Sequence, residues 1–212
     1  MTLSTLLRPA VLLAAALGLA ACGGKASFPI NGTAYGLQYS GLVISTNGMD
    51  LPIAPIPPTA AAPNTVPPVN FSFPNSLSYG ETFNIVVKNQ PTHQTCNTID
   101  PTTGRDTSTD TAGRTVAIHI GLSCSVNSYA IGGSVTGLNT TGLVLTNGSA
   151  GGTATVVSGA TTYSFGNLVP YNVSYGVTVL TQPANAFCTV DNATGVMGDA
   201  AVTNINVSCV PA

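Results

Sequence analysis

An all-β fold made of two tandem β-sandwich modules is predicted from three features of this sequence. Apolar and polar residues alternate with a period of two along several short segments. The 23 glycines and 15 prolines would interrupt any helix of useful length. The second half of the chain also repeats the first half, with cysteines at matching places. Such an internal repeat indicates two copies of one structural unit.

The register of the repeat is set by glycine, glutamine and cysteine residues that recur in the same order. The separation is 101 residues for the glycine pairs, 92 for the glutamines and the first cysteine pair, and 85 for the last cysteine pair. The first copy is therefore longer, and a proline-rich insert at 51–68 supplies part of the excess. Insertions between matched strands are expected to be surface loops. The matched pairs are Gly32 and Gly133, Gly41 and Gly142, Gln90 and Gln182, Cys96 and Cys188, and Cys124 and Cys209.

Residues 1–21 have the features of a secretory signal peptide. Arg8 precedes an apolar run that ends in Leu-Ala-Ala before Cys22, and this run is too short to span a membrane. The Leu-Ala-Ala-Cys box resembles the lipobox of bacterial lipoproteins. The resemblance implies cleavage before Cys22, diacylglycerol on its sulfur and acylation of its new amine by chains such as palmitate. An ordinary signal peptide followed by a chance cysteine is the alternative.

Residues 22–29 would then form a short lipidated tether that holds the first module close to the bilayer. An aspartate directly after the lipidated cysteine would resemble an inner-membrane retention signal, but this chain has Gly23 at that position. An outer-membrane location is therefore favoured, with the protein facing either the periplasm or the cell surface.

The other four cysteines fall two to a repeat, and four cysteines allow three pairings. A module that is copied whole keeps its own disulfide, so the repeat favours Cys96 with Cys124 and Cys188 with Cys209. Disulfides of this kind persist in an oxidising compartment. The alternative, a metal site of four thiolates, lacks any Cys-x-x-Cys pair.

The modules are assigned to residues 30–124 and 125–212. Residues 173–180 alternate between apolar and small polar side chains, which is typical of a strand with one buried face. Asn47-Gly48 and Asn147-Gly148 follow apolar runs and predict tight turns. About seven strands are expected in the second module, near 129–136, 142–147, 153–157, 161–166, 173–180, 186–191 and 200–209, which suits a β-sandwich.

The pattern of the second copy includes Gly-x-Val-x-Gly-Leu from Gly133, Tyr-Ser-Phe from Tyr163 and Val-x-Cys ending at Cys209, and the first copy departs from it at Ala34 and Tyr35. It resembles the β-sandwich repeats found in tandem in many secreted and lipid-anchored bacterial proteins. More distantly it is similar to immunoglobulin-like and transthyretin-like domains. The resemblance implies the fold and a surface location, and it carries no shared catalytic residues.

Charged residues make up only 6% of the chain, against about 25% in ordinary soluble domains. No lysine or arginine follows Arg114, so the second module has no basic patch and a nucleic-acid partner is not expected. Surfaces rich in serine, threonine and asparagine suit neutral partners such as glycans, but they equally suit a passive domain.

The candidate metal ligands are Asp100, Asp106 and Asp110, in the longer inter-cysteine segment of the first module. Aspartates supply oxygen ligands to calcium, but their spacing fits no known calcium loop, and a solvated hairpin loop is favoured. His93 and His119 have no partner at a metal-ligand spacing, and no nucleophile or phosphate-binding motif is present. No cofactor and no enzymatic activity are expected.

Two functions remain open at this point. The first is a non-catalytic, lipid-anchored envelope protein that serves as a structural or interaction module, with the membrane and an envelope protein or glycan as partners. The second is a surface module that binds carbohydrate or calcium. The few residues after Cys124 also predict a stiff join between the modules.

Overall fold

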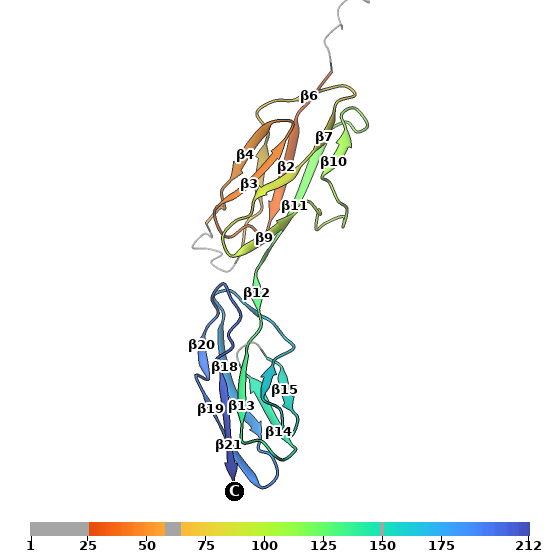
Figure 1. Cartoon of the computed structure of the whole chain (residues 1–212). Coiled ribbons are helices and arrows are strands. Elements are labelled where there is room, and N and C mark those ends of the chain that lie inside the picture. The colour runs from red at the N-terminus through yellow and green to blue at the C-terminus, as the bar shows by residue number, and fades with distance from the viewer. Residues whose placement is uncertain (1–25, 58–64, 149–150) are drawn as a thin grey trace, which may run out of the picture.

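The computed structural model describes residues 26–57, 65–148 and 151–212, which form two β-sandwiches with one disulfide each, as predicted (Figure 1). All regular structure in these ranges is β-strand. No helix that could cross a membrane occurs in them. The predicted signal peptide and Cys22 lie outside the described residues.

The first module contains eleven strands in the described residues, arranged in two larger sheets and two short pairs. The sheet orders are β5-β2-β11-β9 and β4-β3-β8, and the pairs are β1-β6 and β10-β7. The strands are β1 (Ser27–Phe28), β2 (Ile30–Tyr35), β3 (Leu42–Thr46), β4 (Met49–Ile53), β5 (Val69–Ser72), β6 (Leu77–Ser78), β7 (Thr82–Asn84), β8 (Val86–Asn89), β9 (Gln94–Asn97), β10 (Thr109–Thr111) and β11 (Ile118–Val126).

The second module contains ten strands in its described part. Its sheet orders are β16-β13-β21-β19 and β15-β14-β18-β20, with β12-β17 as a short pair next to the first module. The strands are β12 (Ser128–Tyr129), β13 (Gly132–Thr136), β14 (Leu143–Asn147), β15 (Thr153–Val156), β16 (Thr162–Ser164), β17 (Val169–Pro170), β18 (Ser174–Thr181), β19 (Ala186–Asp191), β20 (Thr194–Val196) and β21 (Asn206–Pro211).

The repeat in the sequence extends to strand order and register. In each module a strand from the start and a strand from the end run parallel in the middle of one sheet, β2 with β11 and β13 with β21. In the other sheet, β3 pairs with β8 and β14 with β18. Both of these pairs shift register at the same place, between Val43 and Ile44 and between Val144 and Leu145.

Each module has its own apolar core, built from the inward-facing residues of its two larger sheets. The matched residues Leu42 and Leu143 are both buried, because alternate positions of β3 and β14 face inward. The cysteines of each module lie directly opposite one another on antiparallel neighbours, with Cα atoms 4.0 Å apart. The predicted pairing of Cys96 with Cys124 and Cys188 with Cys209 is confirmed.

The proline-rich insert differs from the predicted loop, because its first residues belong to β4. This strand forms a hairpin with β3 around Asn47 and Gly48, whose φ angles are 47° and 75°. The tight turn predicted there is confirmed. Pro52 is tolerated because β4 lies at the edge of its sheet, where proline leaves no ladder partner unsatisfied. Residues 58–64 of the insert lie outside the described ranges.

The turn predicted at Asn147-Gly148 is wrong in length, since β14 ends at Asn147, β15 begins at Thr153 and the connection spans 148–152. Asn147 is buried and its Oδ1 accepts the N–H of Gly176 at 3.0 Å, so its side chain ties β14 to β18. The last strand begins at Asn206, later than predicted.

Candidate functional site

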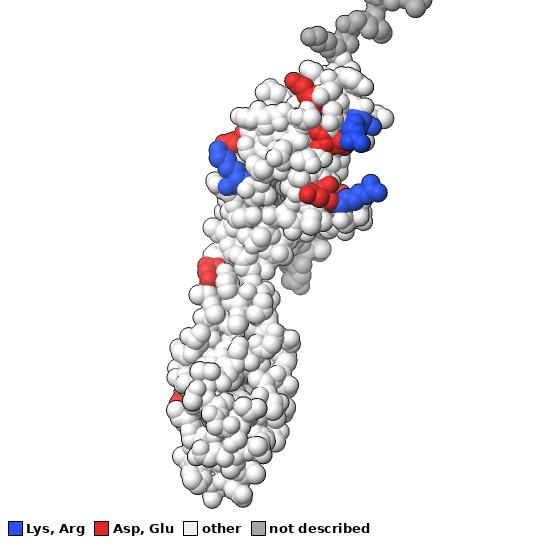
Figure 2. Space-filling view, turned by 45° about the vertical axis from the view of Figure 1, so that its right-hand side comes forward, with Lys and Arg blue, Asp and Glu red and all other residues white. Residues whose placement is uncertain are grey.

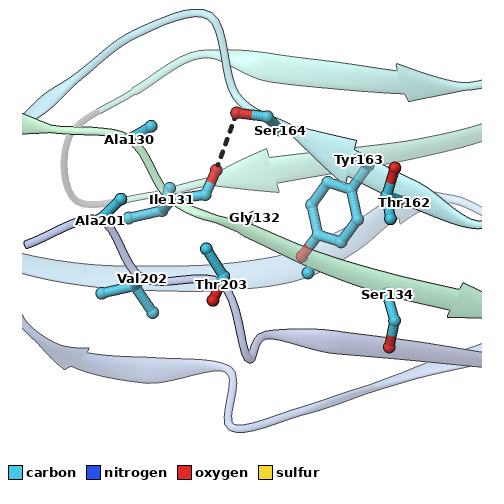
Figure 3. A pocket seen from close by; sticks show the side chains of 11 residues that line it. Ala130, Ile131, Gly132, Ser134, Thr162, Tyr163, Ser164, Ala201, Val202 and Thr203 are labelled. Atoms are coloured by element: carbon cyan, nitrogen blue, oxygen red, sulfur yellow. Dashed lines mark hydrogen bonds between the residues drawn. The ribbon is translucent and has the colours of Figure 1, made fainter.

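The parallel strands of the second module separate near its junction end, and a groove of about 270 Å³ forms there (Figure 3). Ile131 forms an isolated parallel bridge with Val202, and the regular ladder resumes only at the pair Val135 and Val207. The segment that contains Val202 therefore has one more residue between the two pairings than the segment that contains Ile131. In the gap, the side chain of Asn206 replaces a backbone partner and accepts the N–H of Ser134 at 3.1 Å. The apolar part of the lining consists of Ala130, Ile131, Ala201 and Val202.

Tyr163 forms one side of this groove and fixes its shape. Its hydroxyl donates to the carbonyl of Ile205 at 2.9 Å. Opposite it stands Gly133, where an added Cβ would lie only 1.9 Å from the same carbonyl oxygen. In the first module Phe71 faces Gly32 in the same way, without the hydroxyl.

The phenol of Tyr163 is protonated at neutral pH and acts as a donor, and burial raises its pKa to about 12. The hydroxyl of Ser134 donates to Asn206 Oδ1 at 2.8 Å, and that of Ser164 lies 3.5 Å from the Ile131 carbonyl. The lining includes no histidine, carboxylate or basic side chain. This groove can hold a small neutral group, but its lining offers no pair of groups for proton transfer near neutral pH.

A second cavity, of about 360 Å³, lies in the first module, where the charged side chains of the visible face gather (Figure 2). Its lining is half apolar, with Phe83, Ala117 and Ile118, and half polar, with Arg105 and the exposed His119 among the polar residues. It also includes five threonines, Thr103, Thr107, Thr109, Thr111 and Thr115, and the three candidate metal ligands.

The three aspartates line one cavity, but each carboxylate is already used by its own loop. Backbone hydrogen bonds join Thr102 to Asp100 Oδ1 (2.8 Å), Ser108 to Asp106 Oδ1 (2.9 Å) and Thr111 to Asp110 Oδ1 (2.7 Å). The N–H of Ser108 and the hydroxyl of Thr98 hold the pKa of Asp106 below its usual value. Within the described ranges, no three histidine, cysteine or acidic side chains lie close enough to hold a metal ion.

Side chains from both modules meet at the junction. The ring of His93 stacks on that of Tyr171, with centroids 3.8 Å apart and planes at 4°, and Tyr39 packs edge-on against both. His93 Nδ1 lies 2.7 Å from Asp199 Oδ1. His93 therefore has a carboxylate partner, although the sequence offers it none at a metal-ligand spacing. Asp199 is 106 residues away in the chain, so no local pattern reveals the contact.

The connection between the modules is a single residue, Asn127, between β11 and β12. Its N–H donates to the His93 carbonyl at 2.9 Å, and its carbonyl accepts the N–H of Tyr171 at 2.8 Å. Its side chain accepts the hydroxyl of Thr95 at 2.7 Å. The connection is therefore hydrogen-bonded to both modules, and β11 extends two residues past the predicted boundary at 124.

No protein-family model and no curated protein matches this sequence. Of the predicted site residues, the four cysteines form the expected disulfides, the three aspartates share a cavity, and Cys22 lies outside the described residues.

Proposed function

We propose that this chain is a non-catalytic lipoprotein of the bacterial cell envelope, anchored through Cys22 in the outer membrane. In this proposal the two β-sandwiches act as a spacer that presents the second module away from the bilayer. The observation that carries it is the junction, where Asn127 is bonded to both modules and His93 stacks on Tyr171. Contacts of this kind favour one extended arrangement over a freely jointed pair.

The sequence and the disulfides support the envelope location. The signal segment ends at a box that resembles a lipobox, and two disulfides belong to an oxidising compartment. The second module has no basic residue and only two acidic ones, Asp191 and Asp199. Its nearly uncharged surface suits a neutral envelope partner, such as another protein or a glycan.

The test combines peptide mapping with membrane fractionation. Mass spectrometry of the membrane-extracted protein is expected to find acyl groups on the Cys22 peptide. A Cys22→Ser variant is expected to lose these groups and to leave the outer-membrane fraction, whereas Ser27→Ala serves as a matched control that keeps both. An unmodified Cys22 in wild-type protein would contradict the anchor. Immobilised protein that captures no envelope protein or glycan would contradict the interaction role.

A carbohydrate-binding module is the second candidate, favoured by the five threonine hydroxyls and the Arg105 guanidinium around the first-module cavity. Arg105→Ala is expected to abolish binding on a glycan array, while Arg114→Ala, outside the cavity lining, preserves it. Calcium is the weaker form of this candidate, because one oxygen of each carboxylate already accepts bonds from its own loop. Calorimetry with calcium that gives no heat would remove it.

A further inference from the structure

One end of the first module can be identified from strand register. β2 and β11 are parallel, with Ile30 opposite Ile118. The segments that precede these two strands, residues 26–29 and 113–117, therefore lie at the same end. Leu77 of β6 joins them by pairing with Phe28. In Figure 1 this is the end of the first module marked by β6, far from the second module.

Two large side chains project from this end into solvent. Tyr79 is 74% exposed and Val116 is 100% exposed. The Tyr79 ring is nevertheless held in place, because its centroid lies 6.4 Å from that of Phe28 and it covers Gly113, where an added Cβ would come within 2.4 Å of the ring. An aromatic ring is thus fixed by contacts from two segments while most of its surface stays uncovered.

Among the described residues at this end, the cation Arg114 is paired with a carboxylate and Glu81 adds a negative charge. The Arg114 guanidinium donates to Asp110 Oδ1 at 3.2 Å, and Glu81 Oε2 accepts the N–H of Ser78 at 2.6 Å. A contact here would depend on the aromatic and aliphatic side chains rather than on attraction to anionic headgroups.

The length of the tether identifies what covers this end. Ala26, the first described residue, follows Cys22 by four residues, and a chain of four residues spans at most about 14 Å. With Cys22 acylated, this end cannot move far from the headgroup layer. Tyrosine is enriched in that layer because its ring is apolar and its hydroxyl is hydrated.

We infer that this end of the first module rests on the bilayer surface, with Tyr79 and Val116 in contact with lipid. The inference builds on the lipid anchor proposed above and adds a defined contact surface to it. The contact fixes the first module against the membrane, so that the bonded junction directs the second module outward.

The absence of tryptophan from the chain allows a clean test. The full acylated protein with Val116→Trp is reconstituted into phosphatidylethanolamine–phosphatidylglycerol vesicles that carry brominated acyl chains. The matched control is Val157→Trp, at a position 68% exposed in the second module. The tryptophan at position 116 is expected to show a blue-shifted emission and quenching by the brominated lipid, and the one at position 157 neither.

A second variant distinguishes a membrane contact made by the native surface from the membrane affinity of the introduced tryptophan. Tyr79→Ser, combined with Val116→Trp, is expected to weaken the quenching. Co-flotation with an unquenched tryptophan at position 116, or equal quenching at 116 and 157, would overturn the contact and leave the anchor in place. Protein that fails to float with the vesicles would overturn both.

Discussion

The side chain of Gln182 forms a two-way hydrogen-bonded pair with the backbone of Cys188. Its Oε1 accepts the Cys188 N–H at 2.8 Å, and its Nε2 donates to the Cys188 carbonyl at 3.0 Å. Gln90 makes the same pair with Cys96 in the first module, at 2.7 and 3.0 Å. At the edge strand that carries each disulfide, an amide side chain thus replaces a neighbouring strand. Unpaired edges are templates for unwanted strand association, so this contact also protects the edge.

Replacing either glutamine by alanine is expected to destabilise its own module. Gln182→Ala leaves the N–H and carbonyl of Cys188 without their partner, which should lower the free energy of unfolding by about 1–3 kcal/mol. Gln90→Ala should act equally on the first module. Urea unfolding followed by circular dichroism measures the change. Gln38→Ala, which removes an exposed side chain, is the control, and a loss no larger than that of the control would show that the amide pair contributes nothing.

The sequence predicts much of this architecture because the repeat shows most elements twice, so that the pattern in one copy supports the assignment in the other. The matched cysteines predict the disulfides, and the matched residues Gln90 and Gln182 help to set the register of the repeat. The strands β17 and β20 are absent from the prediction, since two or three residues are too few to display alternation. The late start of β21 is also not predicted, because the side chain of Asn206 accepts the N–H of Ser134 and interrupts the backbone ladder.

Gly133→Ala is expected to destabilise the second module by at least about 1–3 kcal/mol, the usual cost of overpacking. The new Cβ would lie 1.9 Å from the Ile205 carbonyl oxygen, and backbone has to move to relieve it. Gly198→Ala is the matched control, because no atom lies within 4 Å of its added Cβ. Chemical unfolding of the two variants measures the difference. Wild-type stability in Gly133→Ala would show that the strands at the groove can separate further without loss.

Tyr163 predicts a loss of stability at alkaline pH. Burial raises its pKa from 10.0 to about 12, so folding favours the neutral phenol. This contribution is fully present below pH 10 and is lost as the pH rises through 12. The free energy of unfolding of the second module should therefore fall between pH 10 and 12, and less steeply in Tyr163→Phe. The difference in tyrosinate absorbance between wild type and Tyr163→Phe should show Tyr163 ionising near pH 12. Equal pH slopes in wild type and variant would contradict this role.

The candidate site is less predictable than the fold, for a physical reason. Tyr39, His93, Tyr171 and Asp199 come from four separate loops, and only the packing of one module on the other brings them together. Loop residues show no periodic pattern in the sequence. The contact between the modules also occurs only once in the described structure, so the internal repeat gives no second copy from which to infer it. The short connection after Cys124 is visible in the sequence, but the side chains that lock it are not.

His93→Ala is expected to loosen the junction while leaving each module folded. The change removes a stacked ring, worth about 0.5–1.5 kcal/mol, and the partner of Asp199, worth up to about 1 kcal/mol at an exposed site. A loss of about 1–2 kcal/mol raises the population of bent arrangements roughly 5- to 30-fold. Small-angle scattering should then show a smaller mean radius of gyration, with unchanged unfolding of both modules. His119→Ala, at an exposed position near the opposite end of β11, is the control. A scattering curve for His93→Ala that matches this control would mean that Asn127 and its backbone bonds hold the modules in line by themselves.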